Sequence, residues 1–177
     1  MRLFISINFD DSVKNSLCHA MEKLKSAGVE GRFPLRANLH LTLVFIGETN
    51  DVKSIRRVID AVSAGPCSMR LSGLGAFKRQ GGDIVWMGVE QNENLSHIQK
   101  QLSNGLSAAG FPIEAREYKP HLTLGRQMTY KAPVNLKELG GAIPPIDVEV
   151  SEVCLMKSEQ IGGRLTYTGV YKKALTE

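Results

Sequence analysis

Apolar and polar residues alternate along several short segments of the chain, and between these segments apolar residues recur at the spacing of a helix face. The first segment, RLFISINF, alternates and is rich in Phe and Ile, which predicts a strand. Asp10 or Asp11 then supplies a capping side chain for a helix that we expect to reach about Lys25. The segment NLHLTLVFIGE, residues 38–48, predicts a second strand ended by Gly47.

Two further helices are predicted where apolar residues lie three and four positions apart. One lies in NDVKSIRRVIDAVSAG, residues 50–65, and the other in NENLSHIQKQLSNGLSAAG, residues 92–110. Residues 67–77 and 83–90 predict two strands, which the turn-rich KRQGG joins into a hairpin. The segments HLTLGR, IDVEVSEVCLMKSE and GRLTYTGVYKKAL predict the remaining strands, the last two closing around the turn at residues 162–163.

The mixture of these elements indicates the fold class. Strands combined with three helices, without a regular alternation of strand and helix, favour an α+β fold with antiparallel sheets. The chain has 177 residues, a usual length for one domain with a real core, so we expect residues 1–177 to form a single domain. Hydrophobic residues make up 42% and charged residues 23%, which is typical of globular proteins and not of disordered or fibrous ones.

Charge and cysteine content bear on the binding partner and the cellular compartment. The formal net charge is +4, which fits a polyanionic partner without requiring one. Cys18, Cys67 and Cys154 are widely spaced, so neither a disulfide framework nor a thiolate zinc site is indicated and a reducing cytoplasm is expected. The apolar run at the amino terminus is shorter than a signal peptide core, and no segment approaches the ~20 apolar residues of a membrane-spanning helix. We therefore expect a protein that is neither exported nor embedded in a membrane.

One four-residue motif occurs twice in the sequence. HLTL spans His40–Leu43 and again His121–Leu124, 81 residues further on. Side chains alternate faces along a strand, so each copy places a histidine and a threonine on one face and two leucines on the other. A lone His-x-Thr on a strand is an ordinary structural pattern. A repeated one predicts an internal duplication in which two related strands line a cleft from opposite sides.

Two histidines and two threonines suit displacement at phosphorus. Imidazole titrates near neutrality, so one ring can be the free base and the other the protonated acid in the same site. In-line attack needs a base beside the entering oxygen and an acid beside the leaving oxygen. The hydroxyls of Thr42 and Thr123 can donate hydrogen bonds to the non-bridging oxygens, where negative charge develops. This arrangement requires no metal ion or other cofactor.

Three other interpretations compete with this chemistry. Catalytic zinc usually takes three protein ligands, and neither strand offers an adjacent Asp, Glu, Cys or second His at ligand spacing. A serine nucleophile is disfavoured because no G-x-S-x-G segment is present. A module that only binds a ligand, without turning it over, would have no need of two titratable groups.

The repeated motif and its surroundings resemble the 2H phosphoesterase superfamily, which is named for paired H-x-[ST]-x motifs. The resemblance is strongest to the RNA 2′,3′-cyclic phosphodiesterases, historically called 2′-5′ RNA ligases, and covers nearly the whole chain. It rests on RLFISINF, NLHLTLVFIGE, GLGAF, IVWMGV, KPHLTLGR and TYTGVYKKAL. It implies a bilobal α+β fold with pseudo-two-fold symmetry: two antiparallel sheets face each other across a cleft, each lobe carries one motif, and the helices lie outside.

The resemblance also implies an activity and residue roles. The reaction would be hydrolysis of an RNA-terminal 2′,3′-cyclic phosphate to a 2′-phosphomonoester, with 2′-5′ ligation when a 5′-hydroxyl replaces water. His40 would be the proton donor to the departing 3′ oxygen and His121 the proton acceptor from water, while Thr42 and Thr123 would hold the phosphoryl oxygens. RNA would be the partner, and no obligate protein partner is indicated.

Two further residues are candidates for substrate binding. Arg126 closes the second motif, where family members place a basic residue near the phosphate. Strict alternation aims Arg126 away from His121, so this role needs a bend near Gly125, and the alternative is a surface charge at a strand end. Phe4 is a candidate for stacking a base, against the simpler interpretation of a core aromatic. Family members often have a basic residue where this chain has Asp83.

The resemblance specifies the reaction class more closely than the substrate, and the alternative without catalysis is a module that binds RNA ends. A related enzyme could act on a smaller cyclic phosphate or on a 2′-5′ linked oligonucleotide. Dependence of kcat/KM on chain length would distinguish these substrates from RNA.

Overall fold

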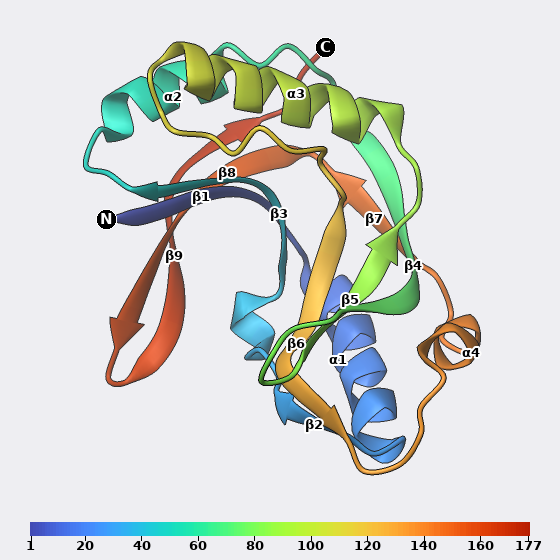
Figure 1. The fold of residues 1–177 in the computed structure, drawn as a ribbon. Coiled ribbons are helices and arrows are strands. Elements are labelled where there is room, and N and C mark those ends of the chain that lie inside the picture. The colour runs from blue at the N-terminus through green and yellow to red at the C-terminus, as the bar shows by residue number, and fades with distance from the viewer.

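A computed structural model describes all residues, 1–177, as two antiparallel sheets with helices around them (Figure 1). The elements in chain order are β1 (Arg2–Asn8), α1 (Asp11–Ser26), β2 (Val29–Arg32), a 3₁₀ turn η1 (Arg36–Asn38), β3 (His40–Glu48), α2 (Val52–Asp60), β4 (Cys67–Phe77), β5 (Asp83–Val89), α3 (Glu93–Ala108), β6 (His121–Tyr130), α4 (Leu136–Gly141), β7 (Ile146–Val150), β8 (Glu152–Ile161) and β9 (Arg164–Ala174).

The two sheets repeat one arrangement. The four-stranded sheet has the order β3-β1-β8-β9, and the five-stranded sheet has the order β2-β6-β5-β4-β7. In the four-stranded sheet the HLTL strand β3 pairs with β1, and in the five-stranded sheet the HLTL strand β6 pairs with β5. In each case a helix of 16 residues lies between the two paired strands in the sequence. The predicted α+β class and the pair of antiparallel sheets are confirmed.

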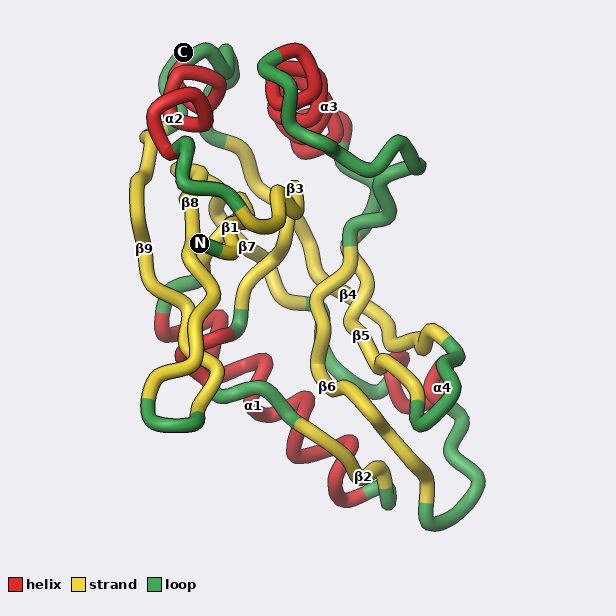
Figure 2. Tube along the Cα trace, turned by 60° about the vertical axis from the view of Figure 1, so that its left-hand side comes forward, coloured by secondary structure: helices red, strands yellow, loops and turns green.

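The helices cover the outer sides of the sheets. Both long helices begin at a side-chain cap that the sequence supplies: Asp10 accepts a hydrogen bond from the backbone of Val13, and Asn92 accepts one from Leu95. Helix α1 contacts β2 and β7 of the five-stranded sheet, whereas α3 contacts β3, β4 and α2. In Figures 1 and 2, α2 and α3 lie side by side at one end of the molecule and α1 lies at the other. None of the helices is long and apolar enough to cross a membrane.

Burial separates the two faces of the HLTL strands. The leucines of both motifs, Leu41, Leu43, Leu122 and Leu124, are at most 2% exposed and belong to the main core. The histidines and threonines between them are only half-buried. One face of each strand therefore packs inward by burying apolar area, and the other is left for polar groups, as the alternation predicted.

Several predicted boundaries were wrong. The helix expected over residues 50–65 ends at Asp60, and the single strand expected over 146–159 is two strands, β7 and β8, which join different sheets. Strand β2 and helix α4 were not predicted. Strand β6 continues past the expected HLTLGR to Tyr130.

Candidate active site

The imidazole of His40 is oriented by its own strand. Its Nδ1 lies 2.7 Å from the backbone oxygen of Asn38, and its Nε2 lies 3.0 Å from Oγ1 of Thr42. A carbonyl oxygen only accepts, so Nδ1 carries a proton and Nε2 is the nitrogen left for chemistry. In the neutral ring, Nε2 accepts its hydrogen bond from the Thr42 hydroxyl.

His121 repeats this orientation on the other sheet. Its Nδ1 lies 2.7 Å from the backbone oxygen of Lys119, again the residue two positions earlier. Nδ1 is therefore the donor in both rings, which leaves Nε2 as the nitrogen available for chemistry in both. The motif fixes the tautomer through a backbone carbonyl rather than through a carboxylate.

Aromatic rings wall both histidines. Phe4 and Tyr167 lie 4.9 Å and 5.0 Å from the His40 ring, centroid to centroid. Phe77 and Trp86 lie 4.9 Å and 6.4 Å from the His121 ring. Gly75 leaves room for the indole of Trp86, because a Cβ at Gly75 would lie 2.3 Å from its ring atoms. These rings pack against each imidazole and cover part of its surface.

Arg126 lies on the same face as His121 because the strand is bulged. In the pairing of β5 with β6, Val85 opposes Gly125 and Trp86 opposes Thr123, so β6 carries one extra residue between them. Next to Arg126, Gln127 has a φ of 51°, in the left-handed region that side chains other than glycine rarely adopt. The bend that the sequence analysis required near Gly125 is present.

The charge of Arg126 reaches the other sheet. Burial lowers the pKa of His40 below its ordinary value, the hydrogen bond to Asn38 raises it in part, and the positive charge of Arg126 lowers it further. Arg126 also acts on Tyr167, whose pKa is raised by burial and lowered in part by this charge. The guanidinium from β6 therefore shares an electrostatic environment with the histidine from β3.

Tyr118, which the sequence analysis did not single out, connects the two motifs by a hydrogen bond. The hydroxyl of Tyr118, three residues before His121, donates to the backbone oxygen of Thr42 at 2.8 Å. Burial raises the pKa of Tyr118, so it stays protonated and remains a donor. A short segment thus orients His121 through Lys119 and contacts the first motif through Tyr118.

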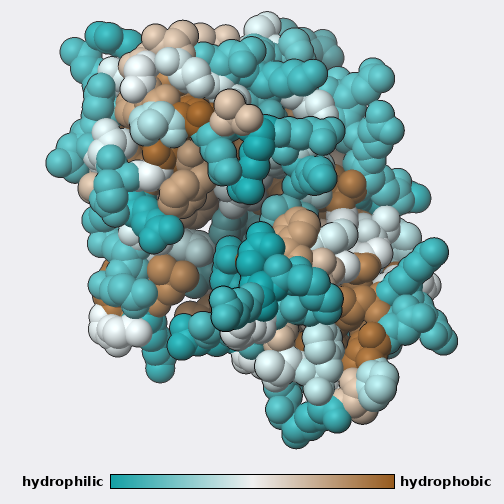
Figure 3. Space-filling view, viewed as in Figure 1, coloured by the Kyte–Doolittle hydropathy of each residue, from teal (hydrophilic) through white to brown (hydrophobic).

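The surface is hollowed between the β8–β9 hairpin and the β4–β5 turn (Figure 3). Tyr167, on β9, packs edge-on against the His40 ring, and Phe77, at the end of β4, packs edge-on against the His121 ring. No group of three or more His, Cys, Asp or Glu side chains is close enough together to hold a metal ion.

The two remaining residues from the sequence analysis have defined positions. Phe4 is 4% exposed and packs with Cys154, Met156 and Tyr167. Asp83 is 7% exposed and accepts hydrogen bonds from Lys78 at 2.7 Å and from Tyr130 at 2.9 Å. The contact with Lys78 is the main cause that lowers the pKa of Asp83. The Asp83 carboxylate is therefore already paired with the side chains of Lys78 and Tyr130.

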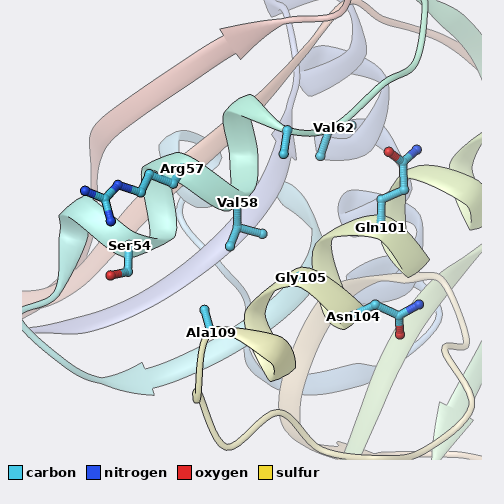
Figure 4. Close-up of a pocket in the computed structure, with 9 residues that line it drawn as sticks. Ser54, Arg57, Val58, Val62, Gln101, Asn104, Gly105 and Ala109 are labelled. Carbon is cyan, nitrogen blue, oxygen red and sulfur yellow. The ribbon is translucent and has the colours of Figure 1, made fainter.

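A separate groove of about 660 Å³ lies between α2 and α3 (Figure 4). Ser54, Arg57 and Val58 line it from α2, and Gln101, Asn104 and Gly105 line it from α3. Neither histidine of the repeated motif lines this groove.

Comparison with known proteins agrees with this geometry. The model of the 2′-5′ RNA ligase superfamily matches residues 13–162. The RNA 2′,3′-cyclic phosphodiesterase of Thermotoga maritima is 34% identical, with 100% of this chain and 94% of that protein covered. The enzyme of the same name from Methanothermobacter thermautotrophicus is 32% identical over 95% of each chain. Escherichia coli LigT, in a crystal structure with 3′-AMP, superposes with a TM-score of 0.82 at 26% identity, over 99% of this chain and 98% of that one. The chain belongs to the 2′-5′ RNA ligase superfamily.

Proposed function

We propose that this protein is an RNA 2′,3′-cyclic phosphodiesterase that hydrolyses the terminal cyclic phosphate to a 2′-phosphomonoester. The observation that carries the proposal is the pair of equivalent His-Thr units, one on each sheet, whose imidazoles are fixed by the same backbone contact. The relatives named RNA 2′,3′-cyclic phosphodiesterase, at 34% and 32% identity over nearly the whole chain, support the substrate class. Residues 1–177 would act as one domain with two lobes.

In the proposed reaction a water oxygen attacks phosphorus while the bond from phosphorus to the 3′ oxygen breaks. His121 takes the water proton at Nε2, and His40 gives its Nε2 proton to the departing 3′ oxygen. The ester bond to the 2′ oxygen remains, which gives the 2′-phosphate. Solvent exchange returns both rings to their starting states. The same site would join RNA ends through a 2′-5′ bond when a 5′-hydroxyl takes the place of water.

The phosphoryl oxygens would be held by Thr42, Thr123 and Arg126. In the free protein Thr42 donates to His40, so substrate must redirect this hydroxyl from the imidazole to the phosphate. Threonine hydroxyls and a guanidinium together offer neutral and charged donors to an anion whose charge grows in the transition state. No carboxylate at the site is needed for this scheme.

A general acid must carry a proton before the reaction, but the lowered pKa of His40 favours its neutral form in the free protein. Bound substrate must therefore favour the protonated form. A cyclic phosphodiester carries one negative charge. Bound between His40 and Arg126, this charge opposes the effect of Arg126 and favours the protonated imidazole. Substrate binding would therefore favour protonation of His40 before the 3′ oxygen departs.

The proposed setting is the cytoplasm. Cys18, Cys67 and Cys154 are unpaired, as a reducing compartment would keep them. The proposed partner is RNA that ends in a cyclic phosphate.

The test is product analysis in excess chelator. RNA ending in a 2′,3′-cyclic phosphate is incubated with the protein and with His40→Ala and His121→Ala variants, and the phosphate position is determined. We expect a 2′-phosphate from the unmodified protein and a loss of at least a hundredfold in rate for each variant. Unaltered RNA that still binds tightly would favour a binding module, and turnover that chelator abolishes would favour a metal site. Equal kcat/KM on short and long substrates would favour a smaller cyclic phosphate.

A further inference from the structure

Two arginine residues lie directly opposite each other on neighbouring strands beside the second motif. In the pairing of β2 with β6, Arg32 is the cross-strand partner of Arg126, and both side chains are exposed. Directly opposed residues project to the same face of a sheet, with their Cβ atoms about 4.5–5.5 Å apart. Like charges in such positions destabilise the strand pair, so stability does not explain this arrangement.

The local backbone brings Arg32 to this position. Gly31 has a φ of 151°, and a Cβ there would lie 2.7 Å from the backbone oxygen of Gln127 and 3.0 Å from that of Arg126. Glycine therefore lets β2 approach the bulged segment of β6 closely. The register of the two strands shifts at this contact, between Glu30 and Arg32, and Arg32 comes to lie opposite Arg126.

No carboxylate neutralises the two guanidinium groups. Neither Arg32 nor Arg126 forms an ion pair with the rest of the chain. The acidic residue that precedes them on β2, Glu30, is paired with Lys131 at 2.7 Å. The two arginines therefore present two uncompensated positive charges at one place, on and beside the strand that carries His121.

We infer that Arg32 binds the phosphodiester on the 5′ side of the terminal nucleotide, while Arg126 binds the cyclic phosphate itself. The inference rests on the proposed function, in which Arg126 helps to hold the cyclic phosphate. A cyclic phosphate carries one negative charge, whereas two opposed guanidinium groups fit two anions. In RNA the second anion is the next phosphodiester of the chain, one ribose away.

The place of β2 in its sheet suits a chain of nucleotides. β2 is the edge strand in the order β2-β6-β5-β4-β7, so RNA that passes from His121 over Arg32 reaches the edge of the sheet without crossing another strand (Figure 1). Neighbouring strands lie about 4.8 Å apart, and two arginine side chains add enough reach to span the ribose between two phosphates. The protein should therefore prefer an oligonucleotide with a charged linkage to a mononucleotide.

The test varies the charge of that one linkage. The substrates are adenosine 2′,3′-cyclic phosphate, the dinucleotide of two adenosines ending in a 2′,3′-cyclic phosphate, and the same dinucleotide with an uncharged methylphosphonate linkage. For Arg32→Gln we expect KM on the charged dinucleotide to rise about 3- to 10-fold, between the effects of losing an exposed ion pair and a charge-assisted hydrogen bond. KM on the other two substrates should change by less than about twofold. Arg32→Lys should keep part of the low KM, because it retains the charge without the forked geometry.

The matched control is Arg57→Gln. Arg57 is an exposed arginine on α2, at the opposite end of the molecule from β2 (Figure 1). This variant should leave KM on all of the substrates unchanged. Thermal unfolding separates binding from a structural role, because the loss of one of two opposed charges relieves repulsion. Arg32→Gln should therefore raise the melting temperature by up to about 4 °C, and a fall would count against the inference.

Equal rises in KM on the charged and uncharged dinucleotides, a rise on the mononucleotide, or no rise on any substrate would overturn the inference. If the unmodified protein turns over none of them, the proposed function fails, and binding decides the role of Arg32. Titration with the dinucleotide ending in a 2′-phosphate should give a Kd that Arg32→Gln raises about 3- to 10-fold only when the linkage is charged. Equal Kd values for the two linkages would overturn the inference.

Discussion

The hydrogen bond from Tyr118 to Thr42 leads to a quantitative prediction. Tyr118→Phe removes one oxygen atom and leaves the ring in place, so the change isolates the 2.8 Å contact that joins the segment before β6 to strand β3. The carbonyl of Thr42 loses a donor in a half-buried position. Such a loss costs about 1–3 kcal/mol of unfolding free energy. For a chain of this size the melting temperature should fall by about 2–12 °C.

The same contact should affect catalysis, because it sets the position of one motif relative to the other. If about 1.4 kcal/mol of the lost energy appears as misplacement of the histidines in the transition state, kcat falls about tenfold. KM for cyclic-phosphate RNA should change little, since Tyr118 is expected to contact no substrate. The assay is steady-state hydrolysis together with thermal unfolding of the same preparations.

Tyr171→Phe is the control for this prediction. The Tyr171 hydroxyl donates to Asp60 on α2, outside the site, so its loss should lower the melting temperature and leave kcat unchanged. If Tyr118→Phe loses stability but keeps kcat within about twofold, the Tyr118 hydroxyl only supports the fold. Our reasoning about the spacing of the motifs would then be refuted.

Three further outcomes follow from the site. Arg126 contributes to the lowered pKa of His40, so Arg126→Gln should raise that pKa. The alkaline limb of the pH profile of kcat/KM, along which the acid loses its proton, should then move to higher pH. An unmoved limb would contradict the interaction between Arg126 and His40. Removal of one phosphate contact should also reduce the slope of log KM against log salt by about 0.7, measured with single-stranded RNA. Gly75→Ala should displace Trp86, the one tryptophan of the chain, and shift its fluorescence emission, whereas Gly141→Ala, whose added Cβ would meet nothing within 4 Å, should not.

The sequence predicts the repeated motif well for a physical reason. Side-chain direction along a strand has a period of two, so a local pattern is enough to place His40 with Thr42 and His121 with Thr123 on one face each. Both pairs are half-buried in the structure while the leucines between them are buried. The α+β class follows from the same local patterns.

Features that depend on distant contacts could not be predicted in this way. The contact of Tyr118 with Thr42 spans 76 positions, and Tyr167 approaches His40 from the last strand. The alternating segment over residues 146–159 gives no sign that β7 and β8 join different sheets, because pairing partners are chosen by tertiary packing. The position of Arg126 was stated only as conditional on a bend, since a bulge reverses the face that alternation predicts.

The most direct test of the central claim, that His40 and His121 divide the acid and base roles, is the effect of the leaving group on each variant. In a 2′,3′-cyclic phosphorothiolate with sulfur at the 3′ position, the leaving thiolate needs no proton. His40→Ala should therefore hydrolyse the sulfur substrate nearly as fast as the unmodified protein, with its loss of about a hundredfold or more confined to the oxygen substrate. His121→Ala should stay slow on both substrates, because water still needs a base. Equal loss for His40→Ala on both substrates would contradict the acid role of His40, and rescue of His121→Ala instead would reverse the two assignments.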